Sequence, residues 1–117
     1  MTIETKIPFQ TIDWDIIEKS FHPGQSGSAI WQTFQWPGLR LRLVEYSPGY
    51  LADHWCSKGH IVHCLNGEFV SELQNGDSFR LTAGMTYIVS DEMSTHRSKT
   101  TTGVKLLIID GAFLKTV

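Results

Sequence analysis

Turn signals divide this sequence into short segments, and that feature constrains the fold more than any other. Most of them are residue pairs that contain glycine: Pro37-Gly38, Pro48-Gly49, Asn66-Gly67, Asn75-Gly76 and Ala83-Gly84, with Gly103 near the end. Several follow one another at about eight to twelve residues, a spacing typical of all-β sandwiches and barrels. We therefore predict an all-β fold.

The segments between these turns predict eight or nine strands. Most carry β-branched or aromatic residues at alternate positions, as strands with one buried face do. The predicted strands cover residues 28–36, 39–46, 60–65, 68–73, 78–81, 86–89, 95–99 and 104–109. Asn66-Gly67 and Asn75-Gly76 each predict a hairpin with a type I′ turn. Only residues 11–20 look helical, with Thr11 or Asp13 as N-cap, so we expect at most one short N-terminal helix.

The length of 117 residues fits one domain with one core, and we treat 1–117 as a single domain. Four Trp, three Tyr and six Phe supply large apolar side chains, so the core needs neither a disulfide nor a metal to fold. Cys56 and Cys64 are the only cysteines. In a reducing compartment we expect them to be free or metal-bound rather than joined.

The charges indicate which partners to exclude. Ten basic and twelve acidic residues are scattered along the chain, for a formal net charge of −2. No cluster of Lys or Arg offers a footprint for phosphates, so we do not expect nucleic acid as a partner. No run reaches the roughly 18 apolar residues that span a bilayer, and residues 1–9 lack a signal-peptide pattern. We expect a cytoplasmic protein that does not enter the membrane.

One short stretch, residues 53–64, concentrates imidazole and thiol groups. On a strand, His54 and Cys56 would point the same way, with their Cα atoms about 6–7 Å apart. After a turn at 57–59, the chain resumes at His60. A borderline-soft metal ion prefers imidazole and thiolate ligands, whereas hydrophobic burial gives no reason to gather them. The alternative is that these are ordinary hydrogen-bonded or buried side chains, and spacing alone leaves both open.

The spacing of this stretch resembles the first sequence motif of the cupin superfamily. In that motif a Gly precedes a His-x-His pair, a Glu follows after three or four residues, and a Gly comes six residues later. Here the corresponding residues are Gly49, His54, Cys56, His60 and Gly67. Asp53-His54-Trp55-Cys56 also resembles the signature of a group of small bacterial cupins named for an Asp-His-Cys-Trp motif.

A second segment, from Gly84 to His96, resembles the second cupin motif more loosely. Ser90 and Glu92 stand where Pro and Gly are usual, and one extra residue precedes His96. The two motifs and the strand before them cover about residues 39–100. The resemblance implies a double-stranded β-helix, the jelly-roll barrel of cupins, together with frequent dimers and one divalent metal ion.

Carried over residue by residue, the resemblance implies His54, His60 and His96 as metal ligands, with Cys56 in place of the second motif histidine. His60 occupies the position of the motif glutamate, so the set becomes three His and one Cys. Thiolate favours transition metals over Mg²⁺ and Mn²⁺, and Zn²⁺, Fe(II) and Ni²⁺ all stay open. Four bound ligands would close the site, whereas a site with Cys56 turned aside keeps a position for water or substrate.

Three functions fit these features. The first is a metal-dependent enzyme on a small polar molecule, an oxygenase, isomerase or hydrolase whose catalytic residues the sequence does not identify. The second is a non-catalytic module that binds or senses a metal or small ligand, and the third is a protein with a structural metal. The resemblance and the exposed edges of a small β fold predict a homodimer, with 28–36 or 104–109 as the candidate interface strand.

Other residues receive no role from the sequence. Strand parity leaves the orientation of six candidate pocket residues open: Trp31, Trp36, Arg42, Tyr46, Asp53 and Tyr87. His22 and His63 are expected to be ordinary loop or outward-facing residues. Arg97 is expected to face away from His96 as a solvated or interface arginine.

Overall fold

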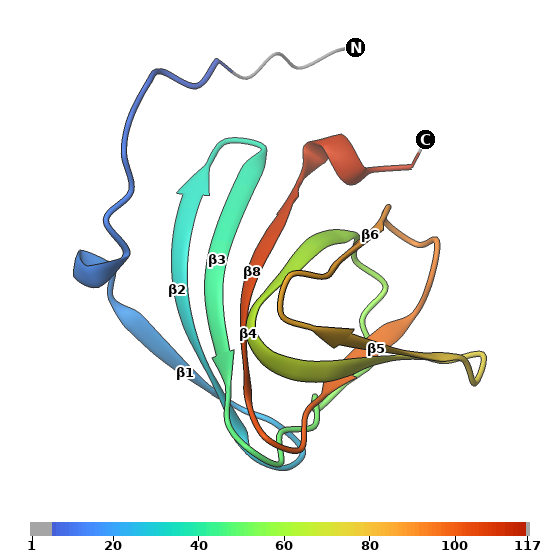
Figure 1. Ribbon diagram of the computed structural model, residues 1–117. Coiled ribbons are helices and arrows are strands. Elements are labelled where there is room, and N and C mark those ends of the chain that lie inside the picture. Colours follow the sequence, from blue (N-terminus) through green and yellow to red (C-terminus); the bar gives the residue numbers. More distant parts are fainter. Residues whose placement is uncertain (1–5, 117) are drawn as a thin grey trace.

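The computed structural model describes residues 6–116, and all its regular structure apart from two short 3₁₀ turns is β (Figure 1). The turns are η1 (Trp14–Ile16) and η2 (Ala112–Leu114). The strands are β1 (Lys19–Pro23), β2 (Ser28–Trp36), β3 (Leu39–Tyr46), β4 (His60–Leu73), β5 (Ser78–Thr82), β6 (Thr86–Val89), β7 (His96–Lys99) and β8 (Val104–Gly111). The all-β prediction is confirmed, and within the described part of the chain no helix is long enough to cross a bilayer.

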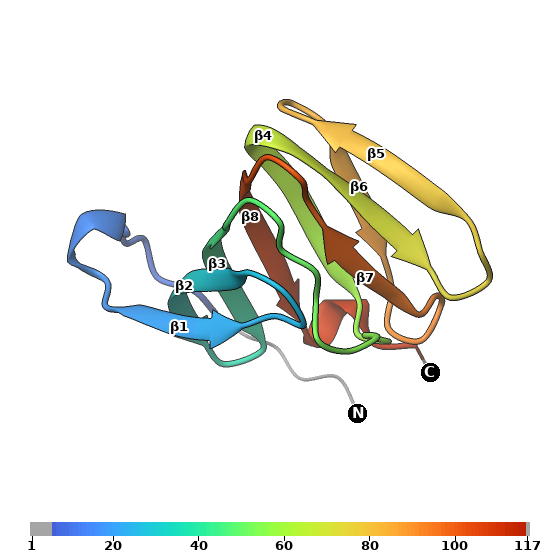
Figure 2. The same cartoon turned by 90° about the horizontal axis from the view of Figure 1, so that it is seen from below.

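The strands are antiparallel throughout and run in the order β1-β2-β3-β8-β4-β5, while β6 and β7 also pair with β4. The first part of β4 pairs with β6 and β8, and its second part pairs with β5 and β7. Figure 2 shows the consequence: β1 to β3 lie on one side of β8 and β4, and β5 to β7 lie on the other. The long strand β4 therefore joins the two halves of the barrel.

The hairpin predicted at Asn66-Gly67 is wrong, because the chain continues there as one strand. The pairing of β4 with β8 shifts its register between Cys64 and Asn66, which is a β-bulge. Gly67 has a φ of 82°, and a Cβ at this position would lie 2.4 Å from the carbonyl oxygen of Gly103. An Asn-Gly pair supplies the positive φ that a bulge needs as well as the one that a turn needs.

The hairpin predicted at Asn75-Gly76 is confirmed, with a different turn. β4 and β5 pair antiparallel on either side of it, and Leu73 N–H donates to the carbonyl of Asp77 over 2.8 Å. Only Gly76 of the pair has a positive φ, of 104°. Since type I′ needs positive φ at both central residues, the loop is of the three-residue kind.

The N-terminal region is more extended than the helix predicted for 11–20. Asp13 caps η1 as expected, accepting a hydrogen bond of 3.0 Å from Asp15 N–H. The helix ends after three residues because Lys19–Pro23 pairs along β2 as strand β1. That pairing also places β2 between β1 and β3, and β8 lies between β3 and β4. The strands expected at a free edge, 28–36 and 104–109, are therefore interior strands.

The core lies between the inward faces of the strands. It comprises Val44, Val62, Cys64, Phe69, Leu81, Val104, Leu106 and Ile108. Phe69 is the one Phe or Trp of the described residues that is fully buried, so mainly aliphatic side chains fill the interior. On β8 the alternation that buries Val104, Leu106 and Ile108 continues to Asp110, which is also buried. A carboxylate thus enters the interior at the end of an apolar row.

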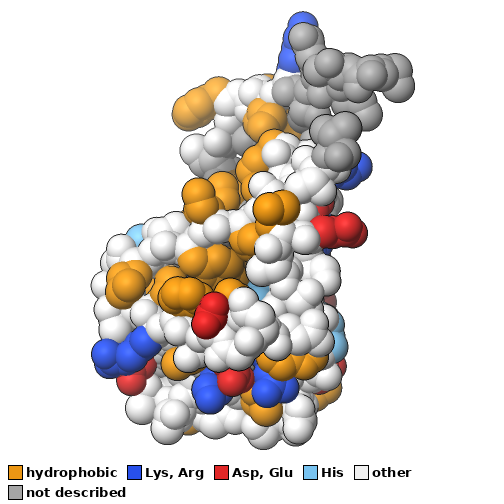
Figure 3. Space-filling view, turned by 90° about the vertical axis from the view of Figure 1, so that its right-hand side faces the viewer, with side chains coloured by type: hydrophobic (Ala, Val, Ile, Leu, Met, Phe, Trp, Pro, Cys, Tyr) orange, Lys and Arg blue, Asp and Glu red, His pale blue; other side chains and the backbone are white. Residues whose placement is uncertain are grey.

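The outside keeps several large apolar side chains in solvent. Figure 3 shows a face on which hydrophobic side chains gather among scattered charges. Over the described surface as a whole, exposed examples include Phe79 of β5, Ile88 of β6 and Phe113 of η2. Phe21 of the edge strand β1 is 68% exposed.

Candidate metal centre

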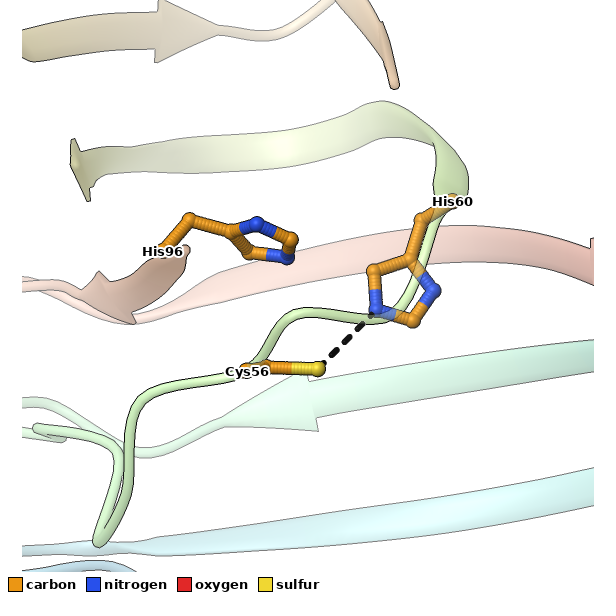
Figure 4. Close-up of side chains that lie close together, drawn as sticks. All are labelled: Cys56, His60 and His96. Carbon is orange, nitrogen blue, oxygen red and sulfur yellow. Dashed lines mark hydrogen bonds between the residues drawn. The ribbon is translucent and has the colours of Figure 1, made fainter. Parts of the chain in front are cut away.

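Three of the predicted ligands converge. The ligand atoms of Cys56, His60 and His96 all lie within 4.8 Å of one another (Figure 4). His60 begins β4 and His96 begins β7. Cys56 lies in the loop that precedes β4, and its backbone exchanges hydrogen bonds of 2.8 and 2.9 Å with that of His96. Two segments distant in sequence are thus fixed to each other beside the start of β4.

The hydrogen bonds of the two imidazoles aim their other nitrogens at the same point. His60 Nδ1–H donates to Asp110 Oδ2 over 3.0 Å, which leaves Nε2 at 3.7 Å from Cys56 Sγ. His96 Nδ1 contacts Ser94 Oγ at 3.2 Å, and its Nε2 is buried with no hydrogen-bond partner in the described part of the chain. Metal-binding histidines are commonly held by such a bond on the second ring nitrogen.

The same contacts set the protonation of the thiol. The neighbouring imidazoles, that of His60 first and that of His96 second, lower the pKa of Cys56 to about 5, although burial acts in the opposite direction. Burial opposes the positive form of His60, yet its bonds to Asp110 and Cys56 leave the His60 pKa raised. At neutral pH Cys56 is therefore a thiolate, which is the form that binds metals.

Asp110 connects this cluster to two arginines. Its carboxylate accepts hydrogen bonds from Arg40 over 2.9 and 2.8 Å and from Arg42 over 3.1 Å, besides the bond from His60. Burial alone would raise the pKa of Asp110, but these donors hold it well below its ordinary value. The sequence analysis missed Asp110 because it ended the last strand at residue 109, although the alternation from Val104 points to it.

The structure does not bring His54 to the other three. Its side chain is 74% exposed and lies 2.6 Å from the Asp53 carboxylate. Strand parity placed His54 beside Cys56, but residues 53–54 form a bend and Cys56 makes only an isolated bridge. The alternation argument therefore does not apply to this segment. A role of His54 as a metal ligand stays a prediction.

The cluster faces a cavity of about 430 Å³. Of the six residues with ambiguous parity, five line it, namely Trp31, Arg42, Tyr46, Asp53 and Tyr87. Two residues that were expected to have ordinary roles line it as well. His22 stacks on Trp31 with ring centroids 3.7 Å apart, and Arg97 lies over the Trp55 ring and donates to Glu72. His63 faces outward and bonds Thr86, as expected.

The residues present fit a transition metal. Cys56 Sγ and His60 Nε2 are 3.7 Å apart, close to the roughly 3.5 Å that a tetrahedral ion with Zn–S of about 2.3 Å and Zn–N of about 2.0 Å imposes. The unpartnered Nε2 of His96 is the third donor, and an ion would satisfy it. One sulfur and two imidazole nitrogens are borderline-soft ligands, suited to Zn²⁺, Fe(II) or Ni²⁺.

Comparison with solved structures identifies the fold. Ectoine synthase from P. lautus aligns over 93% of this chain and 80% of its own, with a TM-score of 0.72 and 15% identity. A sugar phosphate isomerase of the cupin superfamily from Silicibacter pomeroyi aligns over 87% and 75%, with a TM-score of 0.69 and 17% identity. A cupin-2 domain protein from Rhodospirillum rubrum aligns over 92% and 78%, with a TM-score of 0.67 and 16% identity.

These likenesses, at 15 to 17% identity, establish that the chain has the cupin fold. No family model matches the sequence, and no curated protein matches it. The predicted jelly-roll barrel is confirmed. The finer resemblance to the Asp-His-Cys-Trp group stays a prediction.

Proposed function

We propose that this cupin-fold protein binds one divalent transition metal through Cys56, His60 and His96 and acts as a metal-dependent enzyme on a small polar molecule. The observation that supports this most is the aim of the two imidazoles: each has its Nδ1 bonded, and each directs Nε2 toward the cluster. Three protein ligands leave a coordination position for water or substrate, which a catalytic site needs.

A bound metal would supply Lewis-acid catalysis or an activated water in the cavity. The chain's own residues would orient the metal ligands and hold protons in the cavity wall. Asp110 holds the proton of His60 at Nδ1 and so keeps Nε2 as the ligand atom. Burial raises the pKa of the Tyr46 and Tyr87 hydroxyls, so both keep their protons in the cavity wall and would be available as donors to a bound substrate.

Metal analysis tests this proposal. Protein purified without an affinity tag is expected to hold near-stoichiometric zinc, iron or nickel, and a His96→Ala variant to hold none. His63→Ala is the matched control, because His63 bonds only Thr86 on the outside. Equal metal in the two variants, or none in the parent after reconstitution with each ion, contradicts the proposal.

A non-catalytic metal or ligand-binding module is the second candidate. Its support is the place of His54, which is exposed two residues from Cys56 in a segment without regular strand pairing. A fourth ligand from this loop would close the site and remove the open position. Cobalt-substituted protein separates the candidates: added azide shifts the visible spectrum of an open site and leaves that of a closed one unchanged. Cobalt-substituted His54→Ala then shows whether His54 is that ligand.

The remaining proposals concern assembly and location. We propose a homodimer in the cytoplasm. The dimer is supported by the exposed Phe21 and by the outer edge of β1, which pairs only with β2 among residues 6–116. The interface strands named from the sequence are interior, so β1 takes their place. Light scattering on a size-exclusion column that gives the monomer mass at micromolar concentration contradicts the dimer.

A further inference from the structure

The cavity contains two buried hydrogen-bond donors that the metal site does not use. Arg42 Nε and Trp31 Nε1 are both inaccessible to water and have no partner in the residues that the structure describes. Leaving a buried donor unpaired costs about 1–3 kcal/mol, and more for a charged group. Two such donors in one cavity wall indicate acceptors that a ligand supplies.

The two side chains are held together on the inner face of neighbouring strands. Trp31 pairs with Val44 across β2 and β3, so it lies diagonally beside Arg42 on the same face. The Arg42 guanidinium carbon lies 4.6 Å from the centre of the Trp31 ring. His22 stacks on the same indole. These contacts fix the indole, so its N–H does not turn away to find another partner.

The charges near Arg42 leave a positive excess. Arg40 and Arg42 both bond the single carboxylate of Asp110, which also accepts from His60. Arg42 is 7% exposed in its side chain, so water compensates little of its charge. Elsewhere in the cavity, Arg97 is paired with Glu72, Asp53 with His54, and the Cys56 thiolate with His60, while Lys58 also lines the wall. A buried cation with this surplus favours an anionic ligand.

The remaining walls limit the size and shape of that ligand. Apolar and aromatic groups line the same cavity as the arginine: Tyr46, Tyr50, Val62, Leu106 and Ile108. The Arg42 guanidinium lies over the face of the Trp31 ring and can form charge-assisted hydrogen bonds with a carboxylate. The apolar lining suits the body of an organic acid better than a fully hydrated phosphate. The volume of about 430 Å³ admits a small molecule with a short apolar body.

We propose that Arg42 and Trp31 form a subsite for the carboxylate of a small organic acid, next to the Cys56, His60 and His96 cluster. The inference extends the proposed metal-dependent function by naming the class of its ligand, and it rests on that function only for the role of the ligand as substrate. Binding of the acid itself needs Arg42 and Trp31, with or without the metal.

Calorimetric titration with butyrate, butyramide and inorganic phosphate tests the subsite, on metal-free and zinc-loaded protein. Butyrate is expected to bind, and its uncharged isostere butyramide and phosphate to bind at least about 10-fold more weakly. Trp31→Phe keeps the ring and removes the N–H, and should weaken butyrate about 10-fold. Arg42→Lys should weaken it at least as much. Trp36→Phe, whose indole lies outside the cavity lining, is the control and should change nothing.

The outcomes separate this inference from the metal proposal. Zinc-loaded protein that does not bind butyrate, or binds butyramide or phosphate equally well, overturns the carboxylate subsite and leaves the metal site standing. Butyrate binding that Trp31→Phe and Arg42→Lys leave intact also overturns it. If metal-free protein binds butyrate and both variants lose this binding, the subsite is supported even when no metal is ever retained. Circular dichroism on each variant confirms that the barrel is folded.

Discussion

Two aspartate–histidine pairs in this molecule have opposite surroundings. Asp110 and His60 meet from strands β8 and β4, and the aspartate is 2% exposed. Asp53 and His54 are neighbours in a surface bend and are mostly exposed. Their hydrogen bonds have similar lengths, 3.0 and 2.6 Å. An aspartate–histidine contact alone therefore does not make a site. Burial does, together with the further hydrogen bonds that Asp110 accepts from Arg40 and Arg42.

The largest contrast is expected in stability. Asp110→Ala leaves Arg40, Arg42 and His60 without their shared acceptor, and should lower the free energy of unfolding by about 3–5 kcal/mol. Asp53→Ala, at a mostly exposed surface pair, should change it by less than about 1 kcal/mol. Urea denaturation measures both. Equal effects would show that burial does not distinguish the pairs.

Metal affinity gives the next contrast. His60→Ala removes one of three converging ligands and should weaken zinc binding at least about 100-fold, whereas Asp110→Asn, which loosens the ring of His60, should weaken it about 10- to 100-fold. His54→Ala should weaken it less than either, because His54 lies outside the cluster. Competition with a chromogenic chelator gives the three constants. A loss for His54→Ala that equals the loss for His60→Ala would show that the loop closes over the ion.

The buried pair should also make the stability depend on pH. The pKa of Asp110 is lowered in the folded protein, so its contribution to stability is full above about pH 4 and is lost as the pH falls through the folded value. The pKa of His60 is raised, so its contribution is full below about pH 6.5 and is lost as the pH rises through the folded value. The stability gap between parent and Asp110→Asn should therefore be widest near pH 5. Urea titrations at pH 3, 5 and 8 measure it, and a gap independent of pH contradicts the linkage.

The smallest contrast concerns two glycines with positive φ. Gly76→Ala meets open space and should cost about 1 kcal/mol for its conformation alone. Gly67→Ala carries the same conformational cost and also presses a methyl group on the Gly103 carbonyl, so it should cost more. Thermal unfolding of the two variants compares them. A smaller loss for Gly67→Ala would show that the bulge relaxes freely.

The sequence predicted the fold class and most strand bounds, because period-two alternation and turn residues are local signals. The three residues that meet were named through the resemblance to the cupin motifs, since no local signal connects His96 to Cys56 and His60. It failed at Gly67, where the same Asn-Gly pair serves a bulge that depends on the distant Gly103. It failed to place His54, because parity applies only to paired strands. It also missed Asp110, whose partners Arg40 and Arg42 lie far away in sequence.

The backbone bridge between Cys56 and His96 has a consequence for how the ion would enter. Two backbone hydrogen bonds, which involve none of the ligand atoms, hold these residues together, and a further bridge joins Leu51 to Lys99. The fold itself thus brings together the two ends of the segment of about forty residues from Cys56 to His96, before any ion binds. Loading an ion requires only side-chain rotation, so apo and loaded barrels should share one backbone, and hydrogen exchange at Cys56 and His96 should be slow in both.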